Sequence, residues 1–167
     1  LAVSRRALID AARRSDVALA FEGAIGRTGT VARRGSTSWE LDVQGATGHS
    51  SAIFSPAMGA GSVYEAARIL QGFYTEMRKF DGLTLNPGLI VGGTETTLER
   101  TAGTATGKTN ITAQHTRVRG DPRTVSAEQL AAAEEQMRAI VAQNLPRTAA
   151  TISFNEGYPA MPDSAAN

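Results

Sequence analysis

Apolar and polar residues alternate along several stretches of the chain in the way that is typical of strands with one buried face. Between Thr37 and Gln44, the apolar residues Trp39, Leu41 and Val43 occupy every second position. The same period recurs over residues 111–119. Residues 89–91 are a short apolar run bounded by glycines, which is typical of a buried strand. The segments that we expect to form strands are therefore 37–44, 89–91, 111–119 and 149–156.

Two longer segments carry apolar residues at the three- and four-residue spacing of amphipathic helices. The first is expected to start near Pro56, which suits the first turn of a helix, and to be over by Asp81. Its predicted buried stripe is Val63, Ala67, Leu70, Phe73, Tyr74, Met77 and Phe80. The second begins at a capping box, Ser126 with Gln129, and ends before Pro146. Its predicted stripe is Leu130, Ala133, Met137, Ile140 and Val141.

The order of these elements from Thr37 onward is β-α-β-β-α-β. This order predicts an α+β fold of the ferredoxin-like type, a four-stranded antiparallel sheet with two helices on one face. Residues 94–109 are polar and rich in Thr and Gly, so we expect a hairpin or a long loop there.

The N-terminal part has a different pattern. Ser4 can cap a helix over Arg5–Arg14, and the mostly apolar run Asp16–Glu22 predicts a strand that ends on a carboxylate. Residues 23–35 are rich in glycine, and we expect a short strand over 30–34. We place a domain junction in this glycine-rich stretch.

Composition narrows the functional classes. The 167 residues are 41% hydrophobic and 20% charged, as in ordinary globular proteins, and 17 Lys+Arg against 16 Asp+Glu leave a net charge of +1. This balance argues against a strongly basic nucleic-acid binder. The lack of cysteine excludes disulfides and thiolate zinc sites. No apolar run is long enough to span a membrane. The first residue is Leu rather than Met, and we expect a piece of a longer polypeptide.

Residues 102–109, Ala-Gly-Thr-Ala-Thr-Gly-Lys-Thr, nearly match the phosphate-binding P-loop. A P-loop needs a buried strand before it and a helix N-terminus after it, so that backbone N–H groups converge on the phosphate. Here a polar segment precedes the motif and a strand-like alternation follows it. Nucleotide binding is therefore not expected.

Four residues are candidates for functional chemistry. His49 lies in a Gly/Ser/Thr loop, and such a histidine is either a solvated surface residue or a donor to a developing oxyanion. Asn110 ends a Gly-Lys-Thr turn, and Arg123 could hold a carboxylate with both edges of its guanidinium group. Glu22 is a lone carboxylate at a strand end. His115 has no identifiable partner, and we expect it to be structural.

Several of these segments together resemble the zinc-dependent amidohydrolases and exopeptidases of the glutamate carboxypeptidase, acetylornithine deacetylase and succinyl-diaminopimelate desuccinylase group. Residues 4–22 resemble the segment that follows the acidic catalytic motif of that family. The other segments are similar to parts of its lid domain: Gly48-His49-Ser50-Ser51, residues 85–94, Lys108-Thr109-Asn110-Ile111 and Gly120-Asp121-Pro122-Arg123.

The resemblance implies a domain organisation and roles. Residues 1–35 would be a remnant of the catalytic domain with the junction, 36–158 the lid or dimerisation domain, and 159–167 a tail leading back to the catalytic domain. The lid would form a homodimer. His49 would enter the partner's active site and stabilise the oxyanion, while Asn110 and Arg123 bind the substrate. Glu22 would be a metal ligand in the full-length enzyme, which would hold two zinc ions.

The same resemblance limits what this piece can do. The His-x-Asp and Asp-Glu-Glu motifs and the C-terminal His of the family are absent, so we expect the fragment to be inactive and to bind no metal. The segment 94–109 is longer than in the family, and Pro122 stands where a strand residue is commoner. The full-length substrate would be a small peptide or acyl-amino acid with a free carboxylate, without nucleic-acid or membrane partners.

Two questions stay open on the residues alone. The chain could instead be a stand-alone ferredoxin-like module that has a regulatory role or binds a small ligand. The compartment is undetermined; we expect a soluble protein, cytoplasmic or periplasmic.

Overall fold

The computed structural model describes residues 2–16, 26, 28–161 and 163. The chain divides into two compact units, Leu1–Thr30 and Val31–Asn167. The first unit contains helix α1 (Ala2–Ala12), which begins before Ser4, so the predicted Ser4 cap is wrong. The predicted strand over Asp16–Glu22 lies outside the described residues, apart from Asp16.

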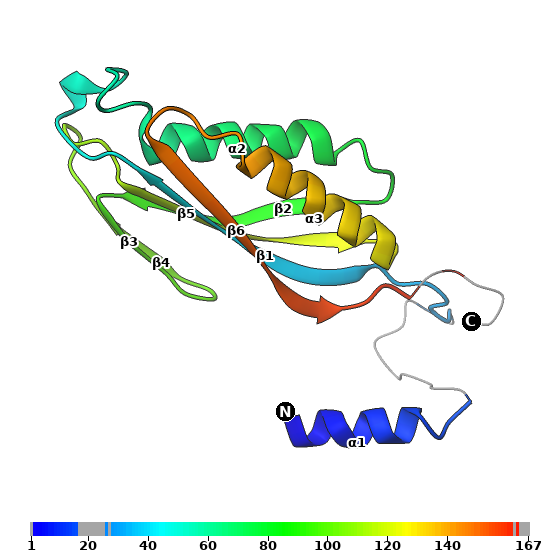
Figure 1. The fold of residues 1–167 in the computed structure, drawn as a ribbon. Helices are drawn as coiled ribbons and strands as arrows, with labels where there is room; N and C mark the ends of the chain where they lie inside the picture. Colours follow the sequence, from blue (N-terminus) through cyan, green and yellow to red (C-terminus); the bar gives the residue numbers. More distant parts are fainter. Residues whose placement is uncertain (1, 17–25, 27, 162, 164–167) are drawn as a thin grey trace. The chain divides into compact units, whose positions relative to one another are not determined.

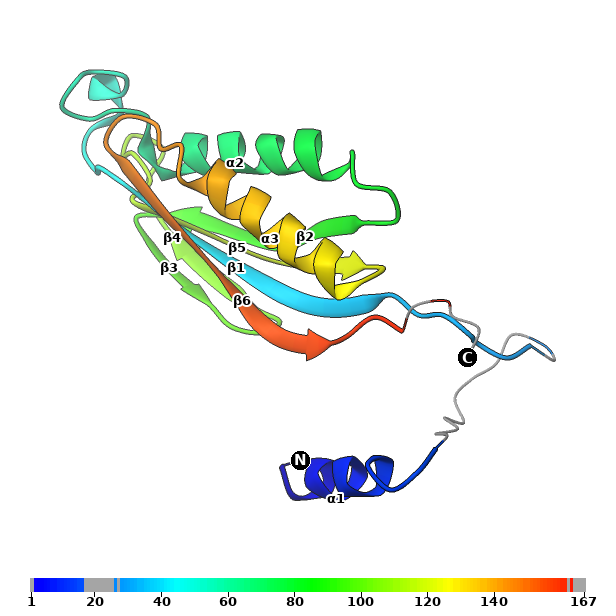
Figure 2. The ribbon, with the colours of Figure 1, turned by 45° about the vertical axis from the view of Figure 1, so that its right-hand side comes forward.

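The second unit is a four-stranded antiparallel sheet with two helices on one face, which confirms the predicted ferredoxin-like fold (Figures 1 and 2). The strand order is β2-β5-β1-β6. The elements of the sheet layer and its helices are β1 (Gly35–Gly45), α2 (Gly61–Met77), β2 (Thr84–Gly93), β5 (His115–Thr124), α3 (Ala127–Val141) and β6 (Thr148–Tyr158).

The core lies between the sheet and the two helices. Trp39, Leu41 and Val43 of the central strand β1 are fully buried, as their alternation predicts. The Trp39 ring meets the Phe73 ring of α2 edge to face, with 5.6 Å between ring centroids. Ile152 and Phe154 of β6 pack against the same core from the sheet side.

Helix α3 follows its sequence pattern closely. The Ser126 hydroxyl accepts a hydrogen bond from the Gln129 N–H at 3.1 Å, and the Gln129 side-chain oxygen accepts one from the Val125 N–H at 2.9 Å. This confirms the predicted capping box, with the return bond made one residue earlier. The predicted stripe is also confirmed, since four of its members are buried and the fifth is half-buried: Ala133, Met137, Ile140 and Val141, with Leu130.

Helix α2 differs from its prediction. It begins at Gly61, five residues after Pro56, and the predicted stripe is rotated: Val63 and Tyr74 are 51% and 64% exposed. Apolar residues lie around much of this helix, so their spacing allows two neighbouring stripes, and packing on the sheet selects one of them. The residues that are buried are Gly61, Ser62, Glu65, Ala66, Ile69, Phe73 and Met77.

The prediction of a short, buried strand at 89–91 is wrong. Strand β2 spans ten residues and lies at an edge of the sheet, where Ile90 is 54% exposed. Strand β5 starts at His115 rather than at residue 111 and continues through Pro122. The pairing of β5 with β1 is interrupted opposite Pro122, which has no N–H to donate.

A separate hairpin follows β2. Strands β3 (Glu95–Leu98) and β4 (Gly103–Thr106) pair with each other on the side of the sheet away from the helices (Figures 1 and 2). Gly103 packs so tightly on β2 that a Cβ atom there would lie 2.8 Å from Val91 Cγ1. The predicted hairpin is therefore confirmed. In the described segment after β4, a turn follows rather than a helix, which is the wrong context for a P-loop.

Two further sequence predictions concern the edges of the fold. In place of a strand over 30–34, the described residues show an isolated bridge between Arg33 and Met161. Within the described ranges, no helix is long and apolar enough to cross a membrane.

Candidate lid site

Strands β1 and β5 continue past the sheet as a narrow two-segment extension, which we call the distal arm and define as residues 46–52 and 107–114. The arm lies beyond the C-terminal end of β1. Gly35, where the chain enters the sheet, is at the other end of this strand. Two backbone hydrogen bonds hold its two segments together: Thr112 N–H donates to the Gly48 carbonyl and Ser50 N–H donates to the Asn110 carbonyl, both at 2.9 Å. Together they form the antiparallel bridge between His49 and Ile111.

The His49 side chain is exposed and held by Ser51. Its Nδ1 lies 3.3 Å from the Ser51 backbone nitrogen and 2.8 Å from the Ser51 hydroxyl. A backbone N–H can only donate, so Nδ1 accepts and the neutral ring carries its proton on Nε2. The arm therefore presents an N–H donor, held in a fixed tautomer, to the solvent.

Asn110 is brought next to His49 although 61 positions separate them in the sequence. It lies in a turn closed by a 3.0 Å hydrogen bond from the Ile111 N–H to the Lys108 carbonyl. Its side chain is exposed and has no hydrogen-bond partner among the described residues. The amide is thus available to a ligand, while the backbone carbonyl is used to hold the arm together.

Lys108 was not recognised as a candidate from the sequence. It is one of two lysines in the chain; the other, Lys79, is paired with Glu76 at 2.7 Å, whereas Lys108 has no ion-pair partner within the described ranges. Residues 46–52 and 107–114 contain no Asp or Glu. The absence of any acid near Lys108 in these two segments is the signal that could have identified it. The distal arm therefore carries a positive charge that is suited to anionic surroundings.

Arg123 lies at the opposite end of β5 from the distal arm, and the structure does not bring it to His49 and Asn110. It is paired with Ser36 and Thr84 across the sheet. Eight residues of extended strand from His115 to Arg123 correspond to about 27 Å at about 3.4 Å per residue. Its Nε contacts an Asp121 carboxylate oxygen at 2.8 Å, and the side chain is 48% exposed.

The metal-binding prediction rests on Glu22, which lies outside the described residues. Among the residues that are described, no group of three or more His, Cys, Asp or Glu side chains is placed to hold a metal ion. His115, at the start of β5, is half-buried, with no partner for its Nδ1 in the same part of the chain.

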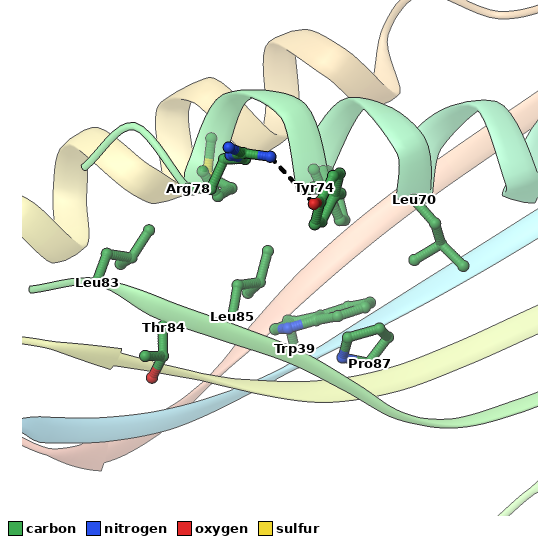
Figure 3. A pocket seen from close by; sticks show the side chains of 10 residues that line it. Trp39, Leu70, Tyr74, Arg78, Leu83, Thr84, Leu85 and Pro87 are labelled. Atoms are coloured by element: carbon green, nitrogen blue, oxygen red, sulfur yellow. Dashed lines mark hydrogen bonds between the residues drawn. The ribbon is translucent and has the colours of Figure 1, made fainter. Parts of the chain in front are cut away.

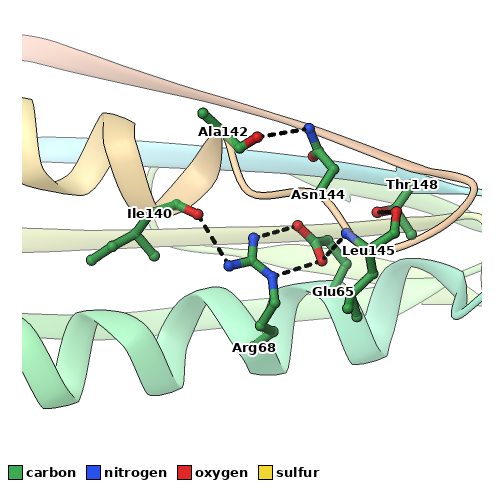
Figure 4. A network of polar contacts seen from close by, with 7 residues as sticks. All are labelled: Glu65, Arg68, Ile140, Ala142, Asn144, Leu145 and Thr148. Atoms are coloured by element: carbon green, nitrogen blue, oxygen red, sulfur yellow. Dashed lines mark hydrogen bonds and ion pairs between the residues drawn. The ribbon is translucent and has the colours of Figure 1, made fainter.

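A buried polar network supports the loops behind the distal arm (Figure 4). The fully buried Glu65 carboxylate accepts two hydrogen bonds from Arg68, at 2.6 and 3.0 Å, and one from the Leu145 N–H at 3.1 Å. Arg68 also donates to the Ile140 carbonyl at 3.1 Å. The network joins α2 to the end of α3 and to the following turn. The sequence reading missed it, although Glu and Arg three residues apart on a helix are its signature.

The turn that follows α3 also contacts the segment between the distal arm and α2. The Ala60 N–H donates to the Pro146 carbonyl at 3.3 Å, and Arg147 Nε donates to the Pro56 carbonyl at 3.1 Å. Gly59 adopts a φ of +67°, and a Cβ atom there would lie 2.0 Å from the Pro146 oxygen. The segment between the arm and α2 is thus held against the turn to which Glu65 is hydrogen-bonded.

An apolar cavity of about 350 Å³ lies between α2 and β2 (Figure 3). Trp39 forms part of its wall, and the indole N–H has no acceptor among the described residues. Tyr74 and Arg78 border it from the helix, joined by a 3.0 Å hydrogen bond. The cavity is therefore next to the free edge of β2 and at the other side of the sheet from the hairpin.

Comparison with solved structures finds the same fold in several hydrolases. Aminopeptidase PepT from Bacillus cereus has 19% identity and a TM-score of 0.60, with 82% of this chain and 33% of that chain covered. A hydantoinase/carbamoylase family amidase from Burkholderia ambifaria has 15% identity and a TM-score of 0.61, with 79% and 30% covered. A tripeptidase from Staphylococcus aureus has 17% identity and a TM-score of 0.58, with 78% and 31% covered.

The chain therefore spans about a third of the length of the solved proteins that it resembles. Among curated proteins, the comparison found no match to the sequence. A family model described as the peptidase dimerisation domain matches residues 31–149, which include the sheet from β1 to the start of β6, both of its helices and the distal arm. The chain belongs to the peptidase dimerisation domain family.

Proposed function

We propose that this chain is the dimerisation and substrate-capping domain of a zinc-dependent exopeptidase or amidohydrolase. The full-length enzyme cleaves an acyl- or peptidyl-amino acid that has a free carboxylate, and the fragment alone is inactive. Residues 36–158 form the lid, between a remnant of the catalytic domain (1–35) and a tail (159–167). The observation that carries the proposal is the distal arm, which places His49 and Asn110 side by side on an exposed projection.

The separation of Arg123 from the arm supports a site shared between subunits. A small peptide cannot bridge about 27 Å of strand, so His49 and Arg123 of one chain cannot hold the same substrate. His49 and Asn110 therefore act in the partner's active site, and Arg123 serves the site of its own subunit. We prefer this function to that of a stand-alone module also because of the family match and because the solved proteins of similar fold are longer chains.

Each residue has a role that its contacts allow. The His49 Nε2–H donates to the oxyanion that forms when water attacks the scissile carbonyl, and the Asn110 amide donates to the substrate's carbonyl. Arg123 leaves its exposed ion pair with Asp121 and binds the substrate carboxylate instead. The contact between the guanidinium group and the carboxylate is planar and charge-assisted. Lys108 raises the local positive potential at the same arm.

The zinc ions belong to the missing part of the enzyme in this proposal. The described residues do not fit a metal site, because they offer no cluster of ligands. We therefore place the metal pair with Glu22 and with residues beyond this chain.

The dimer contact is expected along the edge of β2 and the adjacent surface of α2. This edge is unpaired in the described sheet, and apolar Val63, Tyr74 and Ile90 are more than half exposed beside it. An unpaired edge with apolar side chains is a surface that pairs readily with a second copy. The cavity beneath Tyr74 lies within the same surface.

Ile90→Glu is expected to shift the chain from dimer to monomer, because it places a charge in the apolar contact. Sedimentation equilibrium over a range of concentrations measures the change, with Ala149→Glu on the opposite edge strand β6 as the matched control. A wild-type chain that stays monomeric at all concentrations would contradict the lid interface. Dissociation by Ala149→Glu alone would show that the dimer contact lies at the β6 edge of the sheet.

A further inference from the structure

Two aromatic residues lie on the surface between the distal arm and helix α2. Phe54 belongs to the loop that Figures 1 and 2 show beyond the N-terminal end of α2, and Tyr64 lies in the first turn of that helix. Their ring centroids are 5.6 Å apart, and the two residues are 70% and 53% exposed. We call Phe54 and Tyr64 the aromatic pair. Neither residue belongs to the hydrophobic core, so both rings are available to a partner.

The backbone of Phe54 is held in a conformation that a residue with a Cβ atom rarely adopts. Its φ is +71°, in the left-handed region that favours glycine. Two hydrogen bonds hold the loop in this form: the Phe54 N–H donates to the Gly59 carbonyl at 2.9 Å, and the Gly59 N–H donates to the Ser55 carbonyl at 2.8 Å. Because strain of this kind gathers at sites that bind, it points to a contact that the ring makes outside the described residues.

The segment around the aromatic pair is poor in charge. Residues 43–64 contain no Asp, Glu, Lys or Arg, although these residues make up 20% of the chain. The next residue, Glu65, is fully buried and paired with Arg68. Arg147 meets the loop through the hydrogen bond from its Nε to the Pro56 carbonyl. The centres of protein interfaces are depleted of charge and enriched in aromatic residues. The pair therefore suits an apolar surface of another protein rather than an anionic one.

The aromatic pair stands between two surfaces that the proposed function assigns to the second subunit. On one side, Val63, which precedes Tyr64 in α2, belongs to the proposed dimer contact. On the other side, His49 caps the short turn Ser50–Ala52, which ends two residues before Phe54. A partner that touches Val63 and receives His49 therefore passes over the aromatic pair.

We propose that the aromatic pair anchors the distal arm to an apolar depression on the catalytic part of the second subunit, beside the active site that His49 enters. The proposal rests on the proposed function for the direction of the arm. Aromatic side chains are frequent anchors, because they bury a large area and lose little rotamer freedom. The anchor fixes the base of the arm, and the Nε2–H of His49 is then held at one place in the partner's site.

The test measures how far the two rings are exposed in three states of the protein: the 167-residue chain, the full-length dimer and the full-length monomer. Oxidation of Phe54 and Tyr64 by hydroxyl radicals is read by mass spectrometry, with a free peptide added to normalise the radical dose. The monomer is obtained with Ile90→Glu, or by dilution where that variant still dimerises. We expect both rings to be oxidised readily in the 167-residue chain and in the monomer. In the full-length dimer, oxidation should fall about threefold or more, since the docked surface removes the rings from solvent.

A variant of the pair tests whether the rings themselves hold the contact. Phe54→Ser is expected to raise the oxidation of Tyr64 in the full-length dimer, because half of the anchor is lost. Tyr158→Ser is the matched control: it also removes an exposed aromatic ring, 83% exposed at the end of β6, and should leave Tyr64 protected.

Four outcomes would overturn the proposal. Equal oxidation in the full-length dimer and monomer would show that no partner covers the rings. Protection already in the 167-residue chain would show that a second lid covers them, and protection in the full-length monomer would assign the contact to the same subunit. An unchanged Tyr64 in Phe54→Ser would show that the rings do not hold the contact. The readout needs no turnover, so it is separate from the test of the proposed function: protected rings in an enzyme whose kcat does not depend on His49 would sustain the anchor and remove the catalytic role.

Discussion

In the full-length enzyme, replacing His49 by alanine is expected to lower kcat by about 10²–10³, as the loss of one oxyanion donor does. KM should change little, because the donated hydrogen bond strengthens only when negative charge develops on the oxygen. Steady-state kinetics on the substrate with the free carboxylate measures both constants. His115→Ala, which changes the other histidine of these 167 residues, is the matched control and should retain the wild-type kcat. An unchanged kcat in His49→Ala would remove His49 from the mechanism.

The sharing of the site between subunits has its own test, which uses mixed dimers. We expect His49→Ala and Arg123→Ala homodimers each to be severely impaired. A heterodimer of the two has one site with an intact Arg123 and the partner's intact His49, and it should regain about half of the wild-type activity. If both residues acted on the same subunit's site, neither site of the heterodimer would be complete. Purified heterodimers without activity would therefore contradict the arrangement.

The sequence correctly predicted those parts of the fold in which the hydrophobic pattern allows only one face of the element to be buried. Trp39, Leu41 and Val43 alternate with polar residues, and only one face of a strand can then be buried. In α3 the large apolar residues are confined to one stripe, and a capping box marks the start of the helix, so both the buried face and the N-terminal boundary were correctly predicted.

Other parts depend on contacts that a local pattern does not contain. Helix α2 has apolar residues on two neighbouring stripes, and the sheet decides between them. The position of β2 at an edge, which leaves Ile90 exposed, follows from the order of strands rather than from its own composition. A local reading of spacing cannot show which segments pair across the sheet.

The candidate site, too, was predictable only in part: residue types could be recognised locally, whereas their proximity could not. The residue types of His49 and Asn110 were sufficient to single them out, but their proximity comes from the pairing of two segments that are distant in sequence. The remoteness of Arg123 was equally hidden, since it requires the direction of β5 relative to the arm.

Replacing Glu65 by glutamine is expected to lower the free energy of unfolding by about 3–5 kcal/mol, the usual cost of breaking a buried ion pair on one side. The carboxylate is fully buried and accepts hydrogen bonds from Arg68 and from the Leu145 N–H (Figure 4). Glutamine has nearly the same shape, but it leaves the Arg68 guanidinium group without a counter-charge. Urea unfolding followed by the fluorescence of the single, buried Trp39 measures the change.

Glu76→Gln provides the matched control on the same helix, because it breaks the exposed pair with Lys79 at the same three-residue spacing. An exposed pair contributes little, so the control should change the free energy of unfolding by less than about 1 kcal/mol. The double variant Glu65→Met with Arg68→Met separates charge from packing: it should recover most of the lost stability, since no buried charge is left unpaired. Equal effects of Glu65→Gln and Glu76→Gln would show that the network does not fix the junction of α2, α3 and the turn at Leu145. The loops behind the distal arm would then need another source of order.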